Sequence, residues 1–277
     1  MDANTASNID VFNREAVSWS ADTGLYQIEA ELIDRYFPAP PARVLDIGCG
    51  AGRTTAELVQ KGYTVKAIDL ASALLEIARQ RVPESAPERM NATELAFPAG
   101  TFDAAIFSFN GIDYVFPQSD RLKVFSEVRR VLRIGGVFYY SSHNGVGHLG
   151  RACASMSLRL WLQTMRFIAH QLGNRKIHTG YWIYREGSQK LLTHASSPKA
   201  NLRFIENTGM KVGAVRGSCR YRQEACVSVK SIEEARVPTM AAGGDLAPGH
   251  LRVFRGTYVS LRTLTWCYPH IHYVAFA

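Results

Sequence analysis

The sequence has few cysteines and no long uncharged apolar run. Its five cysteines are scattered and never spaced as CxxC, which argues against a disulfide framework, a zinc ribbon or another metal site. The first residues, MDANTASNID, lack the basic start and apolar core of a signal peptide, and no apolar run is long enough to cross a bilayer. We therefore expect reduced thiols, no metal, no membrane contact and a cytoplasmic location.

The composition is that of an ordinary folded protein, with 47% hydrophobic and 20% charged residues over 277 positions. The net charge of +8 is unevenly spread along the chain. Residues 1–141 carry 14 Lys/Arg and 18 Asp/Glu, a net charge of −4, whereas residues 142–277 carry 18 and 6, a net charge of +12. The second half therefore either meets an anionic partner or presents a solvated basic surface.

The first half alternates short β-branched runs with helical patterns, which is typical of a parallel sheet with crossover helices. The expected strands are RVLDIG, TVKAIDL, FDAAIFSF and GGVFYYSS. The expected helices are TTAELVQKG, ALLEIARQRV and RLKVFSEVRRVLRIGG, preceded by a helix whose apolar face runs from Leu25 to Tyr36. The pattern predicts one doubly wound α/β domain, with residues 1–145 as its ligand-binding part and 146–277 as a cap plus the last strands of the same sheet.

Ligands of such sheets bind beyond the carboxyl ends of the strands. There VLDIGCGAGR places Gly48, Gly50 and Gly52 in a turn that lets backbone approach a ligand closely. Asp46, just before this turn, would repel a dinucleotide pyrophosphate, but it suits a ligand with a cationic group. Asp69 follows the second strand, where a carboxylate can accept hydrogen bonds from a ribose. The predicted ligand is a nucleoside that carries an amino acid.

At roughly residues 40 to 145 the sequence resembles the class I S-adenosylmethionine-dependent methyltransferases. VLDIGCGAGR is similar to the first motif of that family and AIDLASALLEIAR to its acidic second motif. NATELAFPAGTFDAAIFSFNGIDYV is similar to the third and fourth strand ends, and EVRRVLRIGG to the turn before the fifth strand. The resemblance implies a Rossmann-like sheet of seven strands with the last strand antiparallel, and S-adenosylmethionine as cofactor.

The resemblance also implies cofactor-binding positions. These are Asp46, Gly48, Gly50 and Gly52 near the methionine end, Asp69 at the ribose, Leu70, Asn91 and Ala92 at the adenine, and Ser108, Phe109 and Asn110 facing the sulfonium. Asn91 stands where many relatives have Asp, but its amide can still accept from the adenine amino group. For Asp46 a turn-capping role stays open, and for Leu70 a place in the core.

Candidate catalytic residues follow the fourth and fifth strands. His143, in SSHN, is the first candidate for a general base because histidine takes up protons near neutral pH. It could instead orient substrate, or have no part in the site. Asn110 and Asp113 could position the acceptor or a water, and for Asp113 a loop-capping role is equally open. Tyr26 could close over the cofactor carboxylate or simply pack.

The methyl acceptor is expected to contact the second half. Residues 156–173 form an amphipathic helix with Arg166 on its polar face. We interpret its apolar stripe as docked against the sheet or a lid and not as a membrane anchor, because its polar face is only moderately basic. NRKIHTGYWIYREG then places His178, Tyr181 and Trp182 where they could line an aromatic acceptor pocket, with lid packing as the alternative. The basic side chains of this region predict an acceptor that is anionic or aromatic.

Two later strands, KVGAVRG and HIHYVAFA, resemble the antiparallel end of the methyltransferase sheet. The segment 218–269 between them is far longer than a hairpin loop. We interpret it as an insertion that covers the acceptor site or builds an oligomer interface, so a homo-oligomer is one possible assembly.

Two functions remain open after these observations. The first is methylation of an N or O atom of a small molecule, with secondary metabolism as one setting for it. The rival is an RNA or protein methyltransferase that docks its substrate on the basic half. The fourth strand is followed by SFNGID and not by the [DNS]PP[YFW] pattern of adenine-amine methylases, and no RNA-binding module is recognised. We therefore favour a small-molecule partner and expect no nucleic acid.

Overall fold

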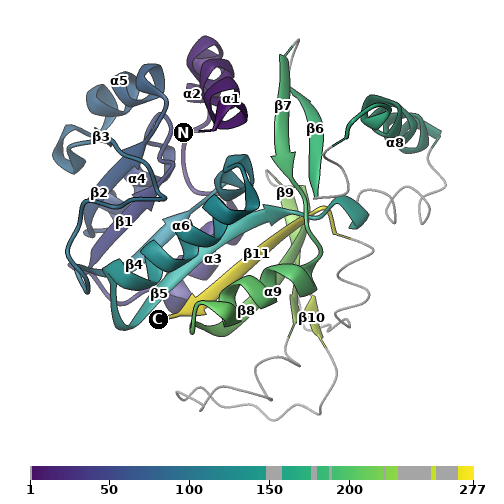
Figure 1. Ribbon diagram of the computed structural model, residues 1–277. Helices are drawn as coiled ribbons and strands as arrows, with labels where there is room; N and C mark the ends of the chain where they lie inside the picture. The colour runs from purple at the N-terminus through teal and green to yellow at the C-terminus, as the bar shows by residue number, and fades with distance from the viewer. Residues whose placement is uncertain are drawn as a thin grey trace.

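A nine-stranded mixed sheet forms the centre of the protein in a computed structural model (Figure 1). The structure describes residues 2–147, 158–175, 180–186, 189–220, 223–229, 251–253 and 268–277. The strand order is β10-β9-β8-β11-β5-β4-β1-β2-β3. The strands span β1 Arg43–Ile47, β2 Thr64–Asp69, β3 Glu88–Arg89, β4 Phe102–Phe107, β5 Leu132–His143, β8 Lys211–Arg220, β9 Gln223–Val229, β10 Leu251–Val253 and β11 His270–Phe276.

The strand directions confirm the predicted sheet. Strands β1 to β5 run parallel to one another, whereas β11 is antiparallel to both β5 and β8. The seven strands from β3 to β8 are the expected set, and β9 and β10 extend the β8 edge by two more. The chain order reverses between β1 and β4, because β2 lies on one side of β1 and β4 on the other. This switch point is where open α/β sheets bind ligands.

Helices cover both faces of the sheet because its strands are apolar on both sides. One face packs against α3 Gln27–Tyr36, α4 Arg53–Gln60 and α5 Ser72–Arg81. The other packs against α6 Gln118–Val131 and α9 Pro198–Asn207. The helices predicted in the first half are therefore present. Burial of Leu32 and Ile33 from α3, and of Phe125 and Val128 from α6, ties each layer to the sheet.

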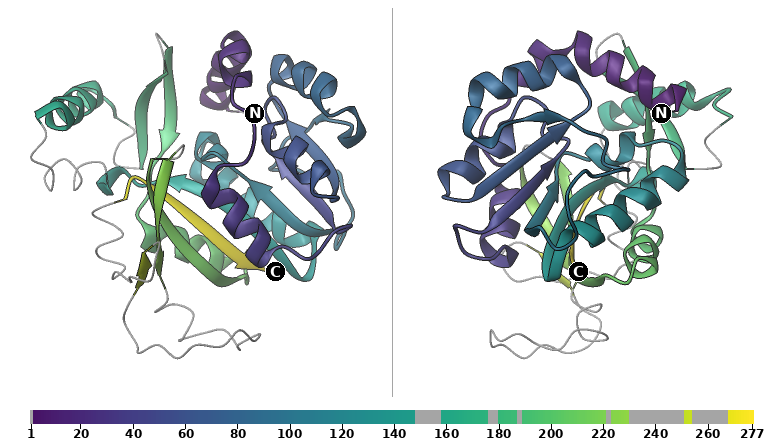
Figure 2. Two further views of the ribbon diagram at one scale, coloured as in Figure 1. Left: turned by 180° about the vertical axis from the view of Figure 1, so that it is seen from behind. Right: turned by 60° about the vertical axis from the view of Figure 1, so that its left-hand side comes forward.

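Two short N-terminal helices and a separate hairpin stand over the carboxyl ends of the strands (Figure 2). The helices are α1 Ala3–Arg14 and α2 Ala16–Ser20, and the hairpin is β6 Tyr181–Glu186 with β7 Gln189–His194. Asn8 joins the two parts: its amide donates to the Leu192 carbonyl at 2.8 Å and accepts from the Leu192 amide at 3.1 Å. The short 3-10 helices η1 Pro83–Ser85 and η2 Gly111–Tyr114 follow α5 and β4.

The exposure of helix α8, Leu158–Gln171, differs from the sequence-based expectation. Its apolar stripe was expected to be docked, but Leu158 is 73% exposed and Leu172 81% exposed. In both views the helix lies at the edge of the molecule, beyond the β6–β7 hairpin (Figure 1, Figure 2). Helical periodicity predicted the stripe correctly, but the described residues bring no sheet or lid over it.

The long segment 218–269 contributes β9 and β10 to the sheet edge, far from the switch point in the strand order. The remainder of that segment lies outside the described residues. Its proposed role in covering the acceptor or in assembly therefore stays a prediction. Across the described ranges, no helix has the length and apolar character needed to traverse a bilayer.

Candidate functional site

The turn between β1 and α4 makes a close backbone approach possible. Gly48 and Gly50 have φ angles of +63° and +55°, in the left-handed region that side chains disfavour. A Cβ at Gly48 would lie 2.5 Å from the Phe107 ring, so the turn and that ring fit together only with glycine. Gly52, with φ +80°, forms the N-cap of α4 and does not line the cavity described below.

Asp69 fastens this turn from the end of β2. Its carboxylate accepts hydrogen bonds from the Gly50 amide and the Ala71 amide, each at 2.8 Å. Desolvation raises the pKa of Asp69, and these backbone donors partly oppose that shift. Asp69 thus combines a structural role in the turn with a place on the cavity wall.

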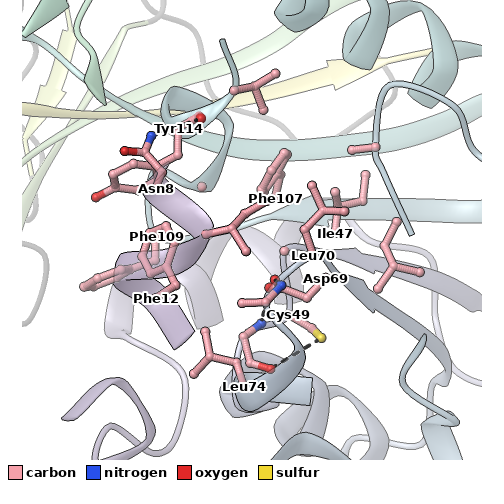
Figure 3. A pocket seen from close by; sticks show the side chains of 18 of the residues that line it. Asn8, Phe12, Ile47, Cys49, Asp69, Leu70, Leu74, Phe107, Phe109 and Tyr114 are labelled. Atoms are coloured by element: carbon pink, nitrogen blue, oxygen red, sulfur yellow. Dashed lines mark hydrogen bonds between the residues drawn. The ribbon is translucent and has the colours of Figure 1, made fainter. Parts of the chain in front are cut away.

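A cavity of about 200 Å³ opens at the switch point (Figure 3). One part of its wall comes from the strand ends expected to hold a nucleoside. From the sequence-predicted set this part contains Gly48, Gly50, Asp69, Leu70, Asn91 and Ala92, and Ser108 and Phe109 continue the wall after β4. The structure therefore brings these eight predicted positions together around one space.

The other part of the wall is aromatic and comes largely from the N-terminal helices. Phe12 packs edge-on against Tyr114 with ring centroids 5.0 Å apart, and Trp19 packs edge-on against Phe109 at 6.1 Å. Tyr26 stacks on Phe109 at 5.7 Å. Figure 3 shows Phe12, Phe109 and Tyr114 on the side of the cavity away from Asp69 and Leu74. Tyr26 and Phe109 were predicted from the sequence, but the other rings of this wall were missed, because α1 and α2 carry no motif.

Arg53 is a second feature that sequence reasoning missed. Its guanidinium makes two contacts of 2.6 and 2.7 Å with Glu29, which is fully buried, and also donates to the Gly24 carbonyl at 2.7 Å. It lies 4.3 Å from the centroid of the Tyr26 ring, and the Ser108 hydroxyl donates to Glu29. The last letter of VLDIGCGAGR was the available signal. This ion pair joins α3, α4 and the end of β4 at the cavity wall.

Asp46 lies behind the turn and not in the cavity wall. One carboxylate oxygen accepts from the Thr54 and Thr55 hydroxyls at 2.6 and 2.7 Å. Burial raises the pKa of Asp46 to about 6, against the opposing effect of the two hydroxyls. This geometry matches the turn-capping alternative: Asp46 holds the first turn of α4 against β1.

His143, Asp113 and Asn110 form a polar cluster adjacent to the cavity. His143 Nδ1 lies 3.0 Å from the Asp113 carboxylate, which also accepts from the His143 backbone amide at 2.5 Å. On the other side of the ring, Asn110 Nδ2 lies 3.3 Å from His143 Nε2. None of the three residues is among the described wall residues. The Tyr114 ring lies edge-on to the His143 ring at 6.4 Å and does line the cavity.

Asp113 is fully buried and has several partners. It accepts from the Ser142 hydroxyl at 2.8 Å, and the buried Arg121 guanidinium lies 3.5 Å away. This cluster orients the imidazole, which is what a His–Asp pair requires if Nε2 is to accept a proton.

The second-half residues expected to bind the acceptor are not part of the described wall. Tyr181 is buried and donates its hydroxyl to the Val115 carbonyl at 3.0 Å, so it supports the wall from behind. Trp182 stacks on Phe167 of α8 at 5.3 Å. Arg166 is exposed on α8, and His178 lies outside the described residues. For Tyr181 and Trp182 the lid-packing alternative fits the structure, and for Arg166 the predicted acceptor contact is not found.

The charges on the described wall also differ from expectation. All of its residues lie between Asp2 and Asp120. The acidic members are Asp2, Asp22, Asp69 and Asp120, and Arg53 is the cationic member in this part of the chain. Because Arg53 is already paired with Glu29, an anionic acceptor finds little positive charge here.

Known proteins are similar to the part of the chain that carries this site. The sequence profile of the family described as Methyltransferase domain matches residues 44–136. The chain is similar to the protein YqeM of Bacillus subtilis, with 31% identity over 120 residues that are 42% of this chain and 46% of that protein. It is also similar to the biotin biosynthesis bifunctional protein BioHC of Cellvibrio japonicus, with 29% identity over 71% of this chain and 36% of that protein.

Solved structures give the same fold. A SAM-dependent methyltransferase from Methanosarcina mazei has a TM-score of 0.59 and 19% identity, over 91% of this chain and 98% of that one. The chain spans less than half the length of the two curated relatives named above. The family profile covers the glycine turn and strands β1 to β4, whereas α1, α2 and the second half of the chain lie outside its range.

Proposed function

Residues 44–136 are a methyltransferase domain of the class I S-adenosylmethionine-dependent family, and from this premise we propose that the chain methylates an N or O atom of a small molecule. The observation that carries the proposal is the single cavity. It runs from the nucleoside-type wall at Asp69 to an aromatic wall supplied by α1, α2 and η2.

The residues present fit S-adenosylmethionine. Gly48 leaves a backbone cradle where a Cβ would collide with Phe107, and the Asp69 carboxylate borders the cavity at the strand end where a ribose is held. Leu70, Asn91 and Ala92 would hold the adenine. Tyr26, which Arg53 contacts beside the turn, would close over the methionine carboxylate. When bound, the cofactor supplies a methyl group already activated by a positively charged sulfur.

Catalysis would then depend mainly on alignment. Ser108 and Phe109 at the end of β4 and the aromatic rings of α1 and α2 would bring the acceptor atom in line with the activated methyl group and exclude water. The new bond would use the acceptor's lone pair, while the electrons of the broken bond stay on sulfur. Aromatic walls also favour a positive charge near their ring faces.

We retain His143 as the proposed general base for acceptors that carry a proton on the attacking atom. Asp113 holds Nδ1, so Nε2 is the nitrogen that would accept the proton. The ring lies behind Tyr114, and the path would therefore run through a water or a small movement of that side chain. An acceptor that is already a neutral amine needs no base to attack.

A small acceptor is favoured because the cavity holds only about 200 Å³ and its wall combines aromatic and other apolar side chains with a few polar groups. A planar acceptor would stack on Phe12, Tyr114 or Phe109. The acidic residues of the wall favour a neutral or cationic acceptor over the anionic one expected from composition.

Labelled cofactor provides the test. The purified chain is incubated with methyl-labelled S-adenosylmethionine and an extract of its host, separated into small molecules, RNA and protein. We expect label in the small-molecule fraction, with loss of that label in an Asp69→Asn variant. Label in RNA or protein alone would instead support the rival function.

A further inference from the structure

Exposed apolar side chains in the described part of the chain are concentrated on one element. Eight large apolar side chains are exposed there, and six of them lie on α8 or directly after it. They are Leu158, Trp161, Leu162, Met165, Ile168 and Leu172, which we call the α8 stripe. Isolated exposed apolar residues are ordinary, but a contiguous patch marks a surface that meets something else.

The contacts of α8 with the hairpin explain how the stripe is kept outward. Gln171 forms a pair of hydrogen bonds with the backbone of Ile183 in β6, at 2.8 and 2.9 Å. Phe167 stacks on Trp182, also in β6. At about 100° of rotation per residue, Phe167 and Gln171 lie on one side of the helix and the stripe lies on another. The helix is thus held by one face and presents a different, apolar one.

Charge along this region has one sign. The sequence contains no Asp or Glu between Glu127 and Glu186, while Arg159, Arg166 and Arg175 fall within or just after α8. All three arginines are exposed. By the same rotation, Arg159 and Arg166 lie along one edge of the stripe, between Leu162 and Phe167. Long arginine side chains beside an apolar stripe can place their charge at a polar boundary while their stems stay in apolar surroundings.

We propose that the α8 stripe binds the surface of an anionic lipid bilayer. The apolar side chains would enter the boundary between headgroups and acyl chains, and Arg159 and Arg166 would meet lipid phosphates. The 14 residues of α8 give a length of roughly 21 Å, shorter than the ~30 Å hydrocarbon core, so the helix lies on the bilayer and does not cross it.

Other occupants fit less well. A nucleic acid would satisfy the arginines but would leave the stripe in water. Two copies of this chain paired through α8 would bring arginines of like charge together with no acidic residue on either helix to offset them. The expectation of no membrane contact rested on the lack of an apolar run long enough to cross a bilayer, and a helix that lies on the bilayer surface needs no such run.

Vesicle flotation tests the proposal and does not depend on the methyl acceptor. The full chain is floated with vesicles of phosphatidylcholine alone or of equal parts phosphatidylglycerol and phosphatidylcholine. We expect binding to the anionic vesicles that weakens as salt is raised, and little binding to the neutral ones. Transfer of Trp161 to the lipid boundary should shift its fluorescence to shorter wavelength, and the shift should be absent in Trp161→Phe.

Two variants provide a matched comparison. Leu162→Glu places a charge in the stripe and should lower partition onto anionic vesicles by about tenfold or more. Ile134→Glu makes the same kind of change at another exposed apolar residue and should leave partition within about twofold. The double change Arg159→Gln with Arg166→Gln should weaken binding to anionic vesicles and leave the small neutral-vesicle signal unchanged.

Three results would overturn the proposal. The first is no flotation of the wild-type chain at low salt. The second is equal loss in Leu162→Glu and Ile134→Glu while circular dichroism shows both folded. The third is a wild-type chain that forms a dimer and does not bind vesicles, and that becomes a monomer in Leu162→Glu. This result would identify the stripe as an interface between copies.

Discussion

Asp69 illustrates how one carboxylate can shape a turn and border a ligand site at the same time. It accepts the Gly50 and Ala71 amides, yet it also lines the cavity. Asp69→Asn places an amide donor near a backbone donor and removes the charge. We expect S-adenosylmethionine to bind about 10- to 100-fold more weakly by calorimetry, the range for a charge-assisted hydrogen bond.

The matched control for Asp69 is Asp34→Asn, which changes an exposed carboxylate paired with Lys61 on the surface. That variant should bind the cofactor as the wild type does. A folded Asp69→Asn protein with undiminished affinity would refute the ribose assignment.

His143 makes a prediction that separates chemistry from binding. Its imidazole is held by Asp113 and Asn110 and does not line the described wall. If the residue is the base, His143→Ala should lower turnover by about 10² or more and leave cofactor affinity nearly unchanged. Steady-state kinetics with the identified acceptor and calorimetry with the cofactor provide the two readouts. Turnover close to wild type would exclude His143 from the mechanism.

Helix α1 shows that an element without a motif can complete a site. Its Asn8 side chain pairs with the backbone of Leu192 much as a neighbouring strand would, and so fixes the helix against β7. Asn8→Ala removes both bonds and should destabilise α1 locally by about 1 to 3 kcal/mol. Hydrogen exchange followed by mass spectrometry should show faster exchange across residues 3–14, together with a higher KM for the acceptor.

Asp10→Ala, on an exposed face of the same helix, is the control for Asn8. It should leave both exchange and KM near wild-type values. Unchanged protection of α1 in Asn8→Ala would mean that the aromatic contacts of Phe12 hold the helix without the Leu192 pairing.

The structure also shows which elements could be predicted from the sequence and which could not. Strands β1, β2, β4 and β5 were predictable because each is a short buried run after a recognisable helix or turn, and Asp69 was predictable because it ends such a strand. Periodicity states which side of a helix is apolar but not what covers that side. For this reason the stripe of α8 was predicted correctly and its docking was not. The aromatic wall depends on how α1 and α2 fold back over the switch point, which is a tertiary contact without local signal.

On the scale of the whole molecule, the two halves of the chain contribute different parts of the structure. The described cavity wall comes entirely from the half with net charge −4, whereas the half with +12 supplies the sheet edge, the hairpin and α8. Strand β5 links them, because it pairs with β4 of the first half and with β11 of the second, whereas β1 lies between β2 and β4 in the same sheet. Asp46 in β1 is 1% exposed, so its ionisation affects the stability of the entire fold.

The pH dependence of that stability can be predicted. Burial raises the pKa of Asp46 from 3.8 to about 6, so between these values the folded chain binds more protons than the unfolded chain. Its free energy of unfolding therefore falls as the pH rises through this window, by about 3 kcal/mol for this group. Asp46→Asn keeps a neutral side chain at every pH. In urea unfolding, the stability of the variant relative to wild type should rise by about that amount from about pH 4 to about pH 7.5, with other titrations cancelling in the difference. A constant difference across that range would show that Asp46 ionises without cost in the folded chain.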